Sequence, residues 1–124
     1  MSKGSILVVE DNMDTYELVS FFLERNGYET FLAANGRDGV NAAIKQSPDL
    51  IIMDLSMPEM DGWTAVGLIK KDERTSSIPL IVLTAHALPG DRQRALDAGS
   101  DDYIAKPMDL ADLVKRVDHW ISKR

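Results

Sequence analysis

Residues 50–54 read Leu-Ile-Ile-Met-Asp, a run of four apolar side chains that ends in a carboxylate. A short, continuous apolar run is typical of a strand that helices cover on both faces of a sheet. Ile6–Val9 and Leu80–Leu83 have the same character, whereas Glu29–Leu32 is more polar and Tyr103–Ala105 is shorter. Helical patterns separate these five runs, and strands that alternate with helices predict a parallel sheet of the α/β class.

Handedness rules narrow the topology that five strand–helix units can adopt. Because crossovers between parallel strands are right-handed, we expect the flavodoxin-like (βα)5 fold, a doubly wound five-stranded sheet in the order 2-1-3-4-5. The polar run Glu29–Leu32 is expected at an edge of that sheet, and the third helix is expected to begin near Gly62. Residues that suit helix starts are Asn12 or Asp14, Asn35, Gly90 or Asp91, and Asp109, while Gly27 and Gly99 suit helix ends.

Length and charge limit the kind of protein that this chain can be. It has 124 residues, no cysteine and a net charge of -6. We therefore expect a single domain, residues 1–124 with no output domain, held together by packing alone. The negative charge opposes direct binding to nucleic acid. No apolar run is long enough for a signal peptide or a membrane span, so we expect a cytoplasmic protein without membrane insertion.

Polar side chains collect where the predicted strands end. Glu10 and Asp11 follow the first strand, Asp54 the third, Thr84 the fourth and Lys106 the fifth. The carboxyl ends of parallel strands form the ligand-binding edge of such a sheet. Three carboxylates at one edge repel one another unless a cation lies among them. Oxygen ligands of this kind favour a hard ion such as Mg²⁺.

The same side chains suit phosphoryl transfer. That reaction needs an in-line nucleophile, a metal that neutralises charge, and donors for the phosphoryl oxygens. Asp54 can be the nucleophile, and the Thr84 hydroxyl and the Lys106 ammonium can be the donors. Taken singly, an acidic pair after a strand is usually a solvated turn, such a threonine makes local hydrogen bonds, and a lone lysine lies at the surface. Their joint occurrence at the strand ends is what favours a functional site.

Over essentially its whole length, the sequence resembles the receiver domains of bacterial two-component response regulators, the CheY-like domains. We find no departure from the family pattern at the chemical positions. The resemblance implies a stand-alone signalling switch rather than an enzyme, one that catalyses only its own phosphorylation and dephosphorylation. The matching segments are Ile6–Asn12, Asp49–Pro58, Asp61–Gly62, Ile81–Ala85 and Gly99–Pro107.

This resemblance also implies roles for the site residues. Asp54 would accept a phosphoryl group from phosphohistidine on a sensor histidine kinase or a histidine phosphotransfer protein, or from a small phosphodonor. Mg²⁺, with Mn²⁺ as a substitute, would be held by Asp11, Asp54 and the backbone carbonyl of Ser56. Glu10 would act mainly through a metal-bound water.

Further roles concern the reading of the phosphate. Thr84 and Lys106 would bind the phosphoryl oxygens, and a cis Lys106–Pro107 bond would aim the lysine. Thr84 and Tyr103 would form the switch, although the residues alone also allow Tyr103 to be a rim aromatic with a solvated hydroxyl. The response would reach the surface formed by the fifth strand and the helices on either side of it.

The remaining expectations concern tuning and partners. Ser56, Ala85 and His86 match positions that tune the lifetime of the acyl phosphate, with ordinary packing as the alternative for Ala85 and simple exposure for His86. The first helix carries more apolar residues than one sheet face needs, Leu18 among them, and its exposed part would dock the kinase. The downstream protein target stays open, as does the choice between signal output and relay. The protein would be a monomer or a weak phosphorylation-dependent dimer.

Two other classes of protein share parts of this pattern. A degenerate receiver that only binds proteins would lack the acceptor, the lysine or the acidic pair, and none of these is missing. A phosphatase-like enzyme would carry a second aspartate two residues after Asp54, where Ser56 stands. A Gly-rich phosphate loop is also absent after the first strand, which argues against nucleotide binding.

Overall fold

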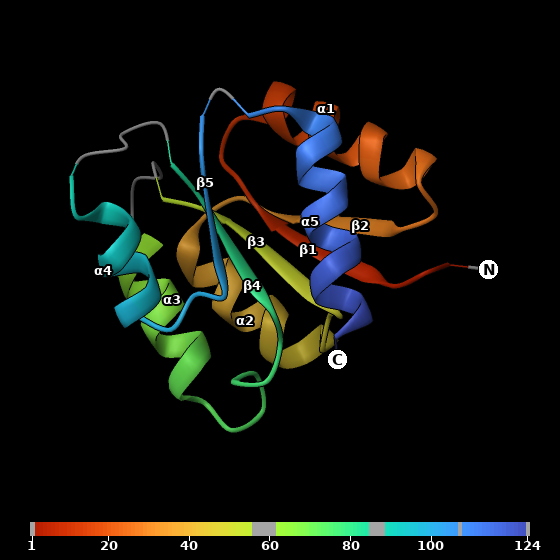
Figure 1. Ribbon diagram of the computed structural model, residues 1–124. Helices are drawn as coiled ribbons and strands as arrows, with labels where there is room; N and C mark the ends of the chain where they lie inside the picture. Colours follow the sequence, from red (N-terminus) through yellow and green to blue (C-terminus); the bar gives the residue numbers. More distant parts are fainter. Residues whose placement is uncertain (1, 56–61, 85–88, 107, 124) are drawn as a thin grey trace.

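The computed structural model describes residues 2–55, 62–84, 89–106 and 108–123. Strands and helices alternate along the chain, and all pairings in the sheet are parallel (Figure 1). The sheet has the predicted order β2-β1-β3-β4-β5. The elements are β1 (Ser5–Val9), α1 (Met13–Arg25), β2 (Glu29–Ala33), α2 (Gly36–Gln46), β3 (Leu50–Asp54), α3 (Gly62–Lys71), β4 (Leu80–Thr84), α4 (Asp91–Asp97), β5 (Asp102–Ala105) and α5 (Leu110–Ser122).

The core consists of two apolar clusters, one on each face of the sheet. Alternate side chains of the central strands point to opposite faces, so Ile51 packs against α2 and α3 while Ile52 packs against α1 and α5. All five residues of β3 and of β4 are buried. This double coverage explains why β1, β3 and β4 are almost wholly apolar, whereas the edge strand β2 tolerates polar residues as predicted.

Local side-chain chemistry sets most helix boundaries. The Asn12 side chain accepts a hydrogen bond from the Thr15 amide, so Asn12 caps α1 and Asp14 lies within its first turn. Gly90, with φ at 89°, precedes α4 without a side-chain cap, and Asp91 is its first residue. Asn35 and Asp109 cap α2 and α5 as predicted, and Gly27 and Gly99 follow the ends of α1 and α4 with positive φ.

Each of the five predicted strands was short by one residue, and two of the missing residues belong to the predicted site. Asp54 and Thr84 are the last residues of β3 and β4 rather than the first residues beyond them. The ladder continues through both positions because Asp54 pairs with Leu83 and Thr84 pairs with Ala105. Their side chains are therefore fixed by sheet geometry and not by loop conformation.

Lys70 links three segments at the other end of the sheet, where β4 and β5 begin. Its ammonium donates hydrogen bonds to the carbonyls of Ser76 and Ile78 and to Asp101 Oδ2, at 3.2, 2.6 and 2.9 Å. Asp101 Oδ2 also accepts from the Leu80 amide at 2.8 Å. One lysine thus ties the end of α3, the loop before β4 and the loop before β5 together.

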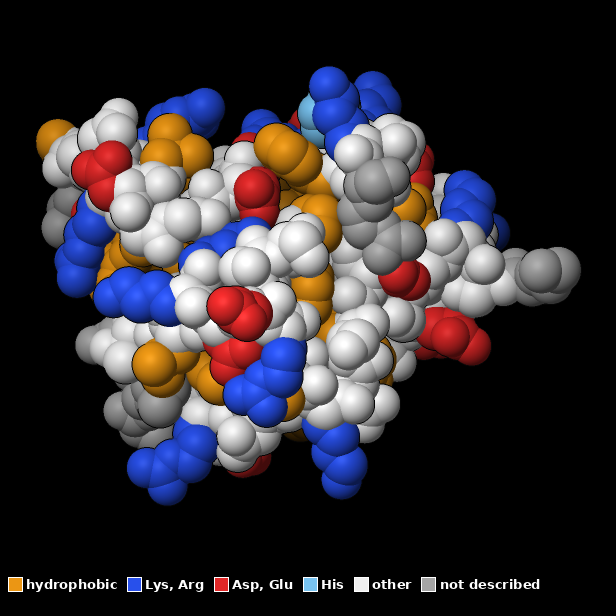
Figure 2. All heavy atoms as spheres, turned by 90° about the horizontal axis from the view of Figure 1, so that it is seen from below, with side chains coloured by type: hydrophobic (Ala, Val, Ile, Leu, Met, Phe, Trp, Pro, Cys, Tyr) orange, Lys and Arg blue, Asp and Glu red, His pale blue; other side chains and the backbone are white. Residues whose placement is uncertain are grey.

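Charges of both signs are interspersed over the face of the molecule seen in Figure 2. Basic side chains do not gather there into one continuous patch. Within the described part of the chain, no helix is long and apolar enough to cross a lipid bilayer.

Candidate functional site

Three carboxylates meet at the carboxyl edge of the sheet. Glu10 and Asp11 follow β1, and Asp54 ends the adjacent strand β3. One carboxylate oxygen from each of the three lies within 4.8 Å of the other two. Glu10 and Asp54 are each only 2% exposed, whereas Asp11 is open to solvent. The cluster therefore has a buried floor and one solvent-facing side.

Lys106 brings a positive charge to this cluster from the other side. Its ammonium lies 2.9 Å from Asp54 Oδ2 and 3.6 Å from Glu10 Oε1. The Lys106 amide donates to the Thr84 carbonyl at 2.7 Å, which fixes the start of the lysine side chain beside the end of β4. Lys106 thus reaches past the end of β4 to contact Asp54 at the end of β3.

The electrostatics of the pocket favour an additional cation. Burial, a hydrogen bond to Asp54 and the Asp54 charge raise the pKa of Glu10 to about 7, against the lowering effects of the Asn12 amide and Lys106. For Lys106, burial lowers the pKa, but the hydrogen bond and charge of Asp54, with help from Glu10, outweigh it and raise the pKa overall. Even with Lys106 beside it, the Glu10 carboxyl holds its proton more strongly than a free glutamate does.

The donor set fits Mg²⁺ on chemical grounds. All three groups offer hard carboxylate oxygens, and the exposed position of Asp11 leaves room for the waters that this ion keeps. The chain has no cysteine, which excludes thiolate ligation of a softer metal.

Glycine at position 62 lets α3 begin close to Asp54. A Cβ built there would lie 2.5 Å from Leu55 Cδ2 and 2.8 Å from Leu55 Cα, and 3.2 Å from the Asp54 carbonyl oxygen. A larger side chain would force the helix away from the end of β3. The sequence placed the helix start here correctly but did not reveal this close packing.

Thr84 and Tyr103 occupy adjoining strands beside the carboxylates. Thr84 ends β4 and is 3% exposed. Tyr103, in β5, is half-buried and packs against the apolar cluster that includes Val82 and Trp63. Burial raises the pKa of Tyr103, with the Asp91 charge adding to the effect and Arg92 opposing it. The ring is therefore neither fully solvated nor fully enclosed.

Several predicted positions lie outside the described residues. These are Ser56, Ala85, His86 and the bond between Lys106 and Pro107. Their expected roles as carbonyl ligand, tuning residues and lysine-aiming bond stay predictions.

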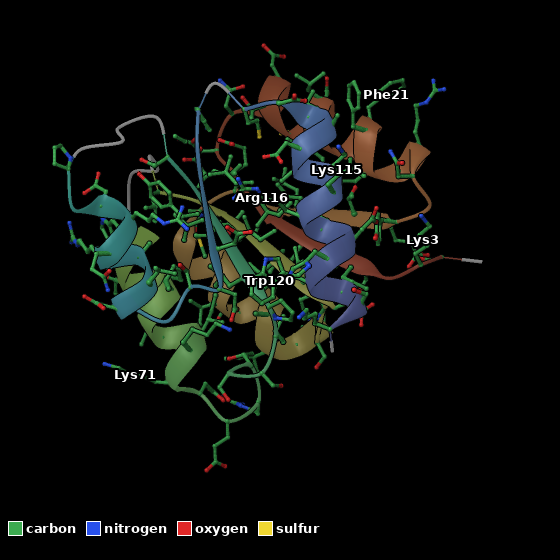
Figure 3. All side chains as sticks on the ribbon, viewed as in Figure 1. Lys3, Phe21, Lys71, Lys115, Arg116 and Trp120 are labelled. Atoms are coloured by element: carbon green, nitrogen blue, oxygen red, sulfur yellow. The ribbon has the colours of Figure 1, made fainter. Side chains whose placement is uncertain are left out.

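The first helix does expose apolar side chains next to the site. Val19 and Leu23 are buried, but Leu18 is 50% and Phe21 54% exposed, and Figure 3 shows Phe21 on α1. A groove of about 230 Å³ runs between α1 and the start of α5. It is lined by Thr15, Leu18, Lys106, Met108 and Leu110.

Residue-level reasoning missed a second charged group on the far side of β5. The Asp102 side chain binds Arg116 and Trp120 of α5, at 2.8 and 2.9 Å. The Asp112–Arg116 pair at i, i+4 is a local signal on the helix surface. Nothing local in the sequence indicates that Asp102 joins it.

The fold and the acidic edge of the sheet define the class, a flavodoxin-like α/β domain with a carboxylate site at its topological switch point. Within that class, the family model for the response regulator receiver domain matches residues 6–118. The chain belongs to this family, whose domains are switches of two-component signalling rather than classical enzymes.

Individual relatives agree with this assignment. The chain is 39% identical over 112 residues to the DNA-binding dual master transcriptional regulator RpaA of Synechocystis sp., covering 90% of this chain and 46% of that protein. It is 33% identical over 117 residues to the polar-differentiation response regulator DivK of Brucella anthropi, covering 94% of this chain and 95% of that protein. The chain thus spans less than half of one relative and nearly all of the other.

A solved structure with a metal ion is also similar. It is the receiver domain of the sensor histidine kinase PA1611 from Pseudomonas aeruginosa PAO1, with a magnesium ion coordinated in its active site cleft. The TM-score is 0.88 at 39% identity, over 96% of this chain and 98% of that one.

Proposed function

We propose that this protein is a phospho-acceptor switch in which Asp54 receives a phosphoryl group from a histidine kinase or a histidine phosphotransfer protein. The observation that carries the proposal is the position of Asp54, buried among Glu10, Asp11 and Lys106 at the carboxyl edge of the sheet. A buried aspartate with a lysine at 2.9 Å and two further carboxylates beside it has the surroundings that phosphoryl transfer requires.

Each neighbour of Asp54 has a role in this proposal. Asp11 and Asp54 would hold Mg²⁺, or Mn²⁺ as a substitute, together with the carbonyl of Ser56, and Glu10 would act through water. When bound, such an ion would neutralise the charge that develops on the phosphoryl oxygens. The Lys106 ammonium, which already holds Asp54 Oδ2, moves its hydrogen bond to a phosphoryl oxygen, and the Thr84 hydroxyl donates to another.

The transfer itself is a simple displacement at phosphorus. A carboxylate oxygen of Asp54 attacks the phosphorus of phosphohistidine, and a new P–O bond forms as the P–N bond breaks. The electron pair of that bond returns to the imidazole nitrogen, leaving a mixed anhydride on Asp54. Water removes the modification by attacking the same phosphorus, which breaks the P–O bond to Asp54, restores the carboxylate and releases inorganic phosphate. Ser56, Ala85 and His86 tune that step. The chain catalyses only these two reactions of its own acceptor.

We propose that the helix of the kinase that carries the phosphohistidine docks in the groove beside α1. Leu18 lines this groove together with Lys106, so a helix seated there would present its phosphohistidine next to the acceptor. The exposed Leu18 and Phe21 give the apolar contact that docking of an amphipathic helix needs.

The wider setting of the switch follows from this role. We propose a cytoplasmic protein that acts as a monomer or as a weak phosphorylation-dependent dimer. Its output is binding of a protein target, or passage of the phosphate to a relay. Direct binding of nucleic acid is not proposed because the net charge is -6.

One experiment tests the proposal directly. The protein and Asp54→Asn are incubated with acetyl phosphate and Mg²⁺, and intact masses are measured. Aspartyl phosphorylation predicts an added mass of about 80 Da on the parent only. No addition with acetyl phosphate or phosphoramidate would favour a protein-binding module, and equal addition to Asp54→Asn would place the acceptor elsewhere.

A further inference from the structure

The outer edge of β5 is closed by side chains rather than by another strand. Among the described residues, β5 is the last strand of the sheet, and β4 is the one strand that pairs with it. The Lys106 amide donates to the Thr84 carbonyl, so the period of two along a strand directs the main-chain groups of Tyr103 away from β4. An edge strand leaves such groups unpaired unless something covers them.

Asp102 and Arg116 cover them. The Tyr103 amide donates to Asp102 Oδ1 at 2.8 Å, and the Tyr103 carbonyl accepts from the Arg116 guanidinium at 3.1 Å. The same guanidinium nitrogen lies 2.8 Å from Asp102 Oδ1. Both outward-facing main-chain groups of Tyr103 are therefore held by one ion pair.

This ion pair is anchored on α5 at three successive turns. The Arg116 Nε donates to Asp112 Oδ2 at 3.0 Å, and the Trp120 indole donates to Asp102 Oδ2 at 2.9 Å. Residues 112, 116 and 120 share one face of the helix. Arg116 and Trp120 extend from α5 toward β5, whereas Lys115 takes another side of the helix (Figure 3).

The Tyr103 ring lies on the opposite face of the sheet from this anchor. It packs with the apolar cluster that contains residues of α3 and α4, whereas α5 packs with the other cluster. The helix on the ring's side is short: α4 has seven residues, and Gly90, which precedes it, offers no side-chain cap. The Arg94 guanidinium carbon of α4 lies 4.2 Å from the centroid of the Trp63 ring of α3.

We propose that Arg116 is a positioning residue that pins the main chain of Tyr103 to α5, so that the response to phosphorylation is carried by the Tyr103 ring and α4 while α5 stays fixed. Because the main chain of Tyr103 is held in place, this residue can respond only by rotation of its side chain. The state-dependent surface is then α4 and its contact with Trp63, not α5. This inference rests on the proposed role of Asp54 as phospho-acceptor.

The two tryptophans of the chain report on the two helices separately. Trp63 stacks with Arg94 of α4, and Trp120 is hydrogen-bonded to Asp102 within the α5 anchor. Trp120→Phe leaves Trp63 as the only indole, and Trp63→Phe leaves Trp120. Emission of each protein is recorded with Mg²⁺ alone as the baseline and then with acetyl phosphate, and the change is divided by the modified fraction from intact mass.

With no further substitution, we expect the emission of Trp63, measured in Trp120→Phe, to change several-fold more on phosphorylation than the emission of Trp120, measured in Trp63→Phe. Adding Arg116→Ala to Trp63→Phe is expected to release the anchor and make Trp120 respond as strongly as Trp63 does. Lys115→Ala, at an exposed position of α5 next to Arg116, is the matched control and should leave the Trp120 emission unchanged. Asp102→Asn, which keeps its size and an acceptor for Trp120 but loses the charge that holds Arg116, repeats the release in a second variant.

Two results would overturn the inference in protein whose Asp54 is modified. One is a change in Trp120 emission as large as that of Trp63 while Arg116 is intact. The other is an unchanged Trp120 emission in folded Arg116→Ala and Asp102→Asn. The thermal unfolding transition of each variant establishes that it is folded. Absence of the phosphoryl mass on Asp54 is a different failure, because it removes the proposed function itself.

Discussion

The Lys106 ammonium lies 2.9 Å from Asp54 Oδ2, although β3, which ends at Asp54, and β5, which precedes Lys106, are not neighbours in the sheet. β4 lies between β3 and β5, so the lysine reaches across the strand end where Thr84 stands. The contact has two consequences. It offsets part of the repulsion among the three carboxylates, and it places a cation where a phosphoryl group on Asp54 would need one.

Removing this lysine should destabilise the metal-free protein. In Lys106→Ala, Asp54 and Glu10 lose their cationic partner, and a buried acceptor without its partner costs about 1–3 kcal/mol. We expect a free energy of unfolding lower by that amount in urea titrations without divalent ions. Saturating Mg²⁺ should return most of the loss, because it replaces the missing positive charge.

Lys115→Ala is the control for this measurement, since it removes an exposed lysine of α5 that is not part of the acidic cluster. Its free energy of unfolding should equal that of the parent. If Lys106→Ala is as stable as Lys115→Ala without Mg²⁺, the lysine does not relieve the carboxylates.

The pKa of Glu10 predicts a pH dependence of the stabilisation by Mg²⁺. The folded-state value of about 7 is above the ordinary 4.5, so the stability contributed by this proton is full below pH 4.5 and is lost as the pH rises toward 7. Mg²⁺ must compete with that proton. The shift in melting temperature produced by Mg²⁺ should therefore grow between about pH 5.5 and pH 8.

The matched variant is Glu10→Gln, which keeps the size of the side chain and removes its titration. Its Mg²⁺-induced shift in melting temperature should vary much less over the same pH range. An equal shift at both pH values in the parent would mean that the Glu10 proton does not oppose metal binding.

Lys70 should contribute to stability without affecting the acceptor. Lys70→Met keeps an apolar stem but removes the ammonium that Ser76, Ile78 and Asp101 share. We expect a loss of about 2–3 kcal/mol in the free energy of unfolding, because charged hydrogen bonds to partly buried acceptors are lost. Lys71→Met, at an exposed neighbouring position labelled in Figure 3, should cost far less.

The rate of phosphorylation of Asp54 by acetyl phosphate distinguishes a loss of stability alone from a disturbance of the acceptor. Lys70 lies at the end of the sheet opposite the acidic cluster, so this rate should match that of the parent in folded Lys70→Met. A large drop in the rate would show that the two ends of the sheet are coupled.

The sequence was informative where one local cause dominates. β1, β3 and β4 were predictable because burial on both faces demands continuous apolar runs, and the gathering of Glu10, Asp11 and Asp54 follows from parallel strand ends. The choice between Asn12 and Asp14 stayed open because both side chains can cap a helix. The exposure of a particular residue such as Leu18 depends on how α1 rotates against the sheet.

The anchor of Tyr103 shows a different limit. Asp102 and Arg116 are 14 residues apart, and their contact requires α5 to lie along the edge of β5 at one particular rotation. Neither residue type nor local spacing fixes that rotation. Long-range polar contacts of this kind become visible only once the elements are packed.

The groove beside α1 predicts a mutation that separates protein donors from small ones. Leu18 is 50% exposed and lines the groove with Lys106 but is not part of the acidic cluster. Leu18→Asp should place an unpaired charge against any docked apolar helix. We expect phosphoryl transfer from a phosphorylated histidine kinase to slow by about tenfold, since a central contact is worth roughly 1.4 kcal/mol or more. Transfer from acetyl phosphate needs no docking and should keep the parent rate.

The control is Leu68→Asp on α3, an apolar residue with a similar exposure of 44% that does not line the groove. The kinase that phosphorylates the parent fastest is used for all three proteins, with transfer followed by the loss of label from the kinase. Equal slowing by Leu18→Asp and Leu68→Asp would mean that the groove is not the docking site. Slowing of acetyl phosphate transfer by Leu18→Asp would mean that the substitution disturbs the acceptor, because a small donor reaches Asp54 without contact with α1.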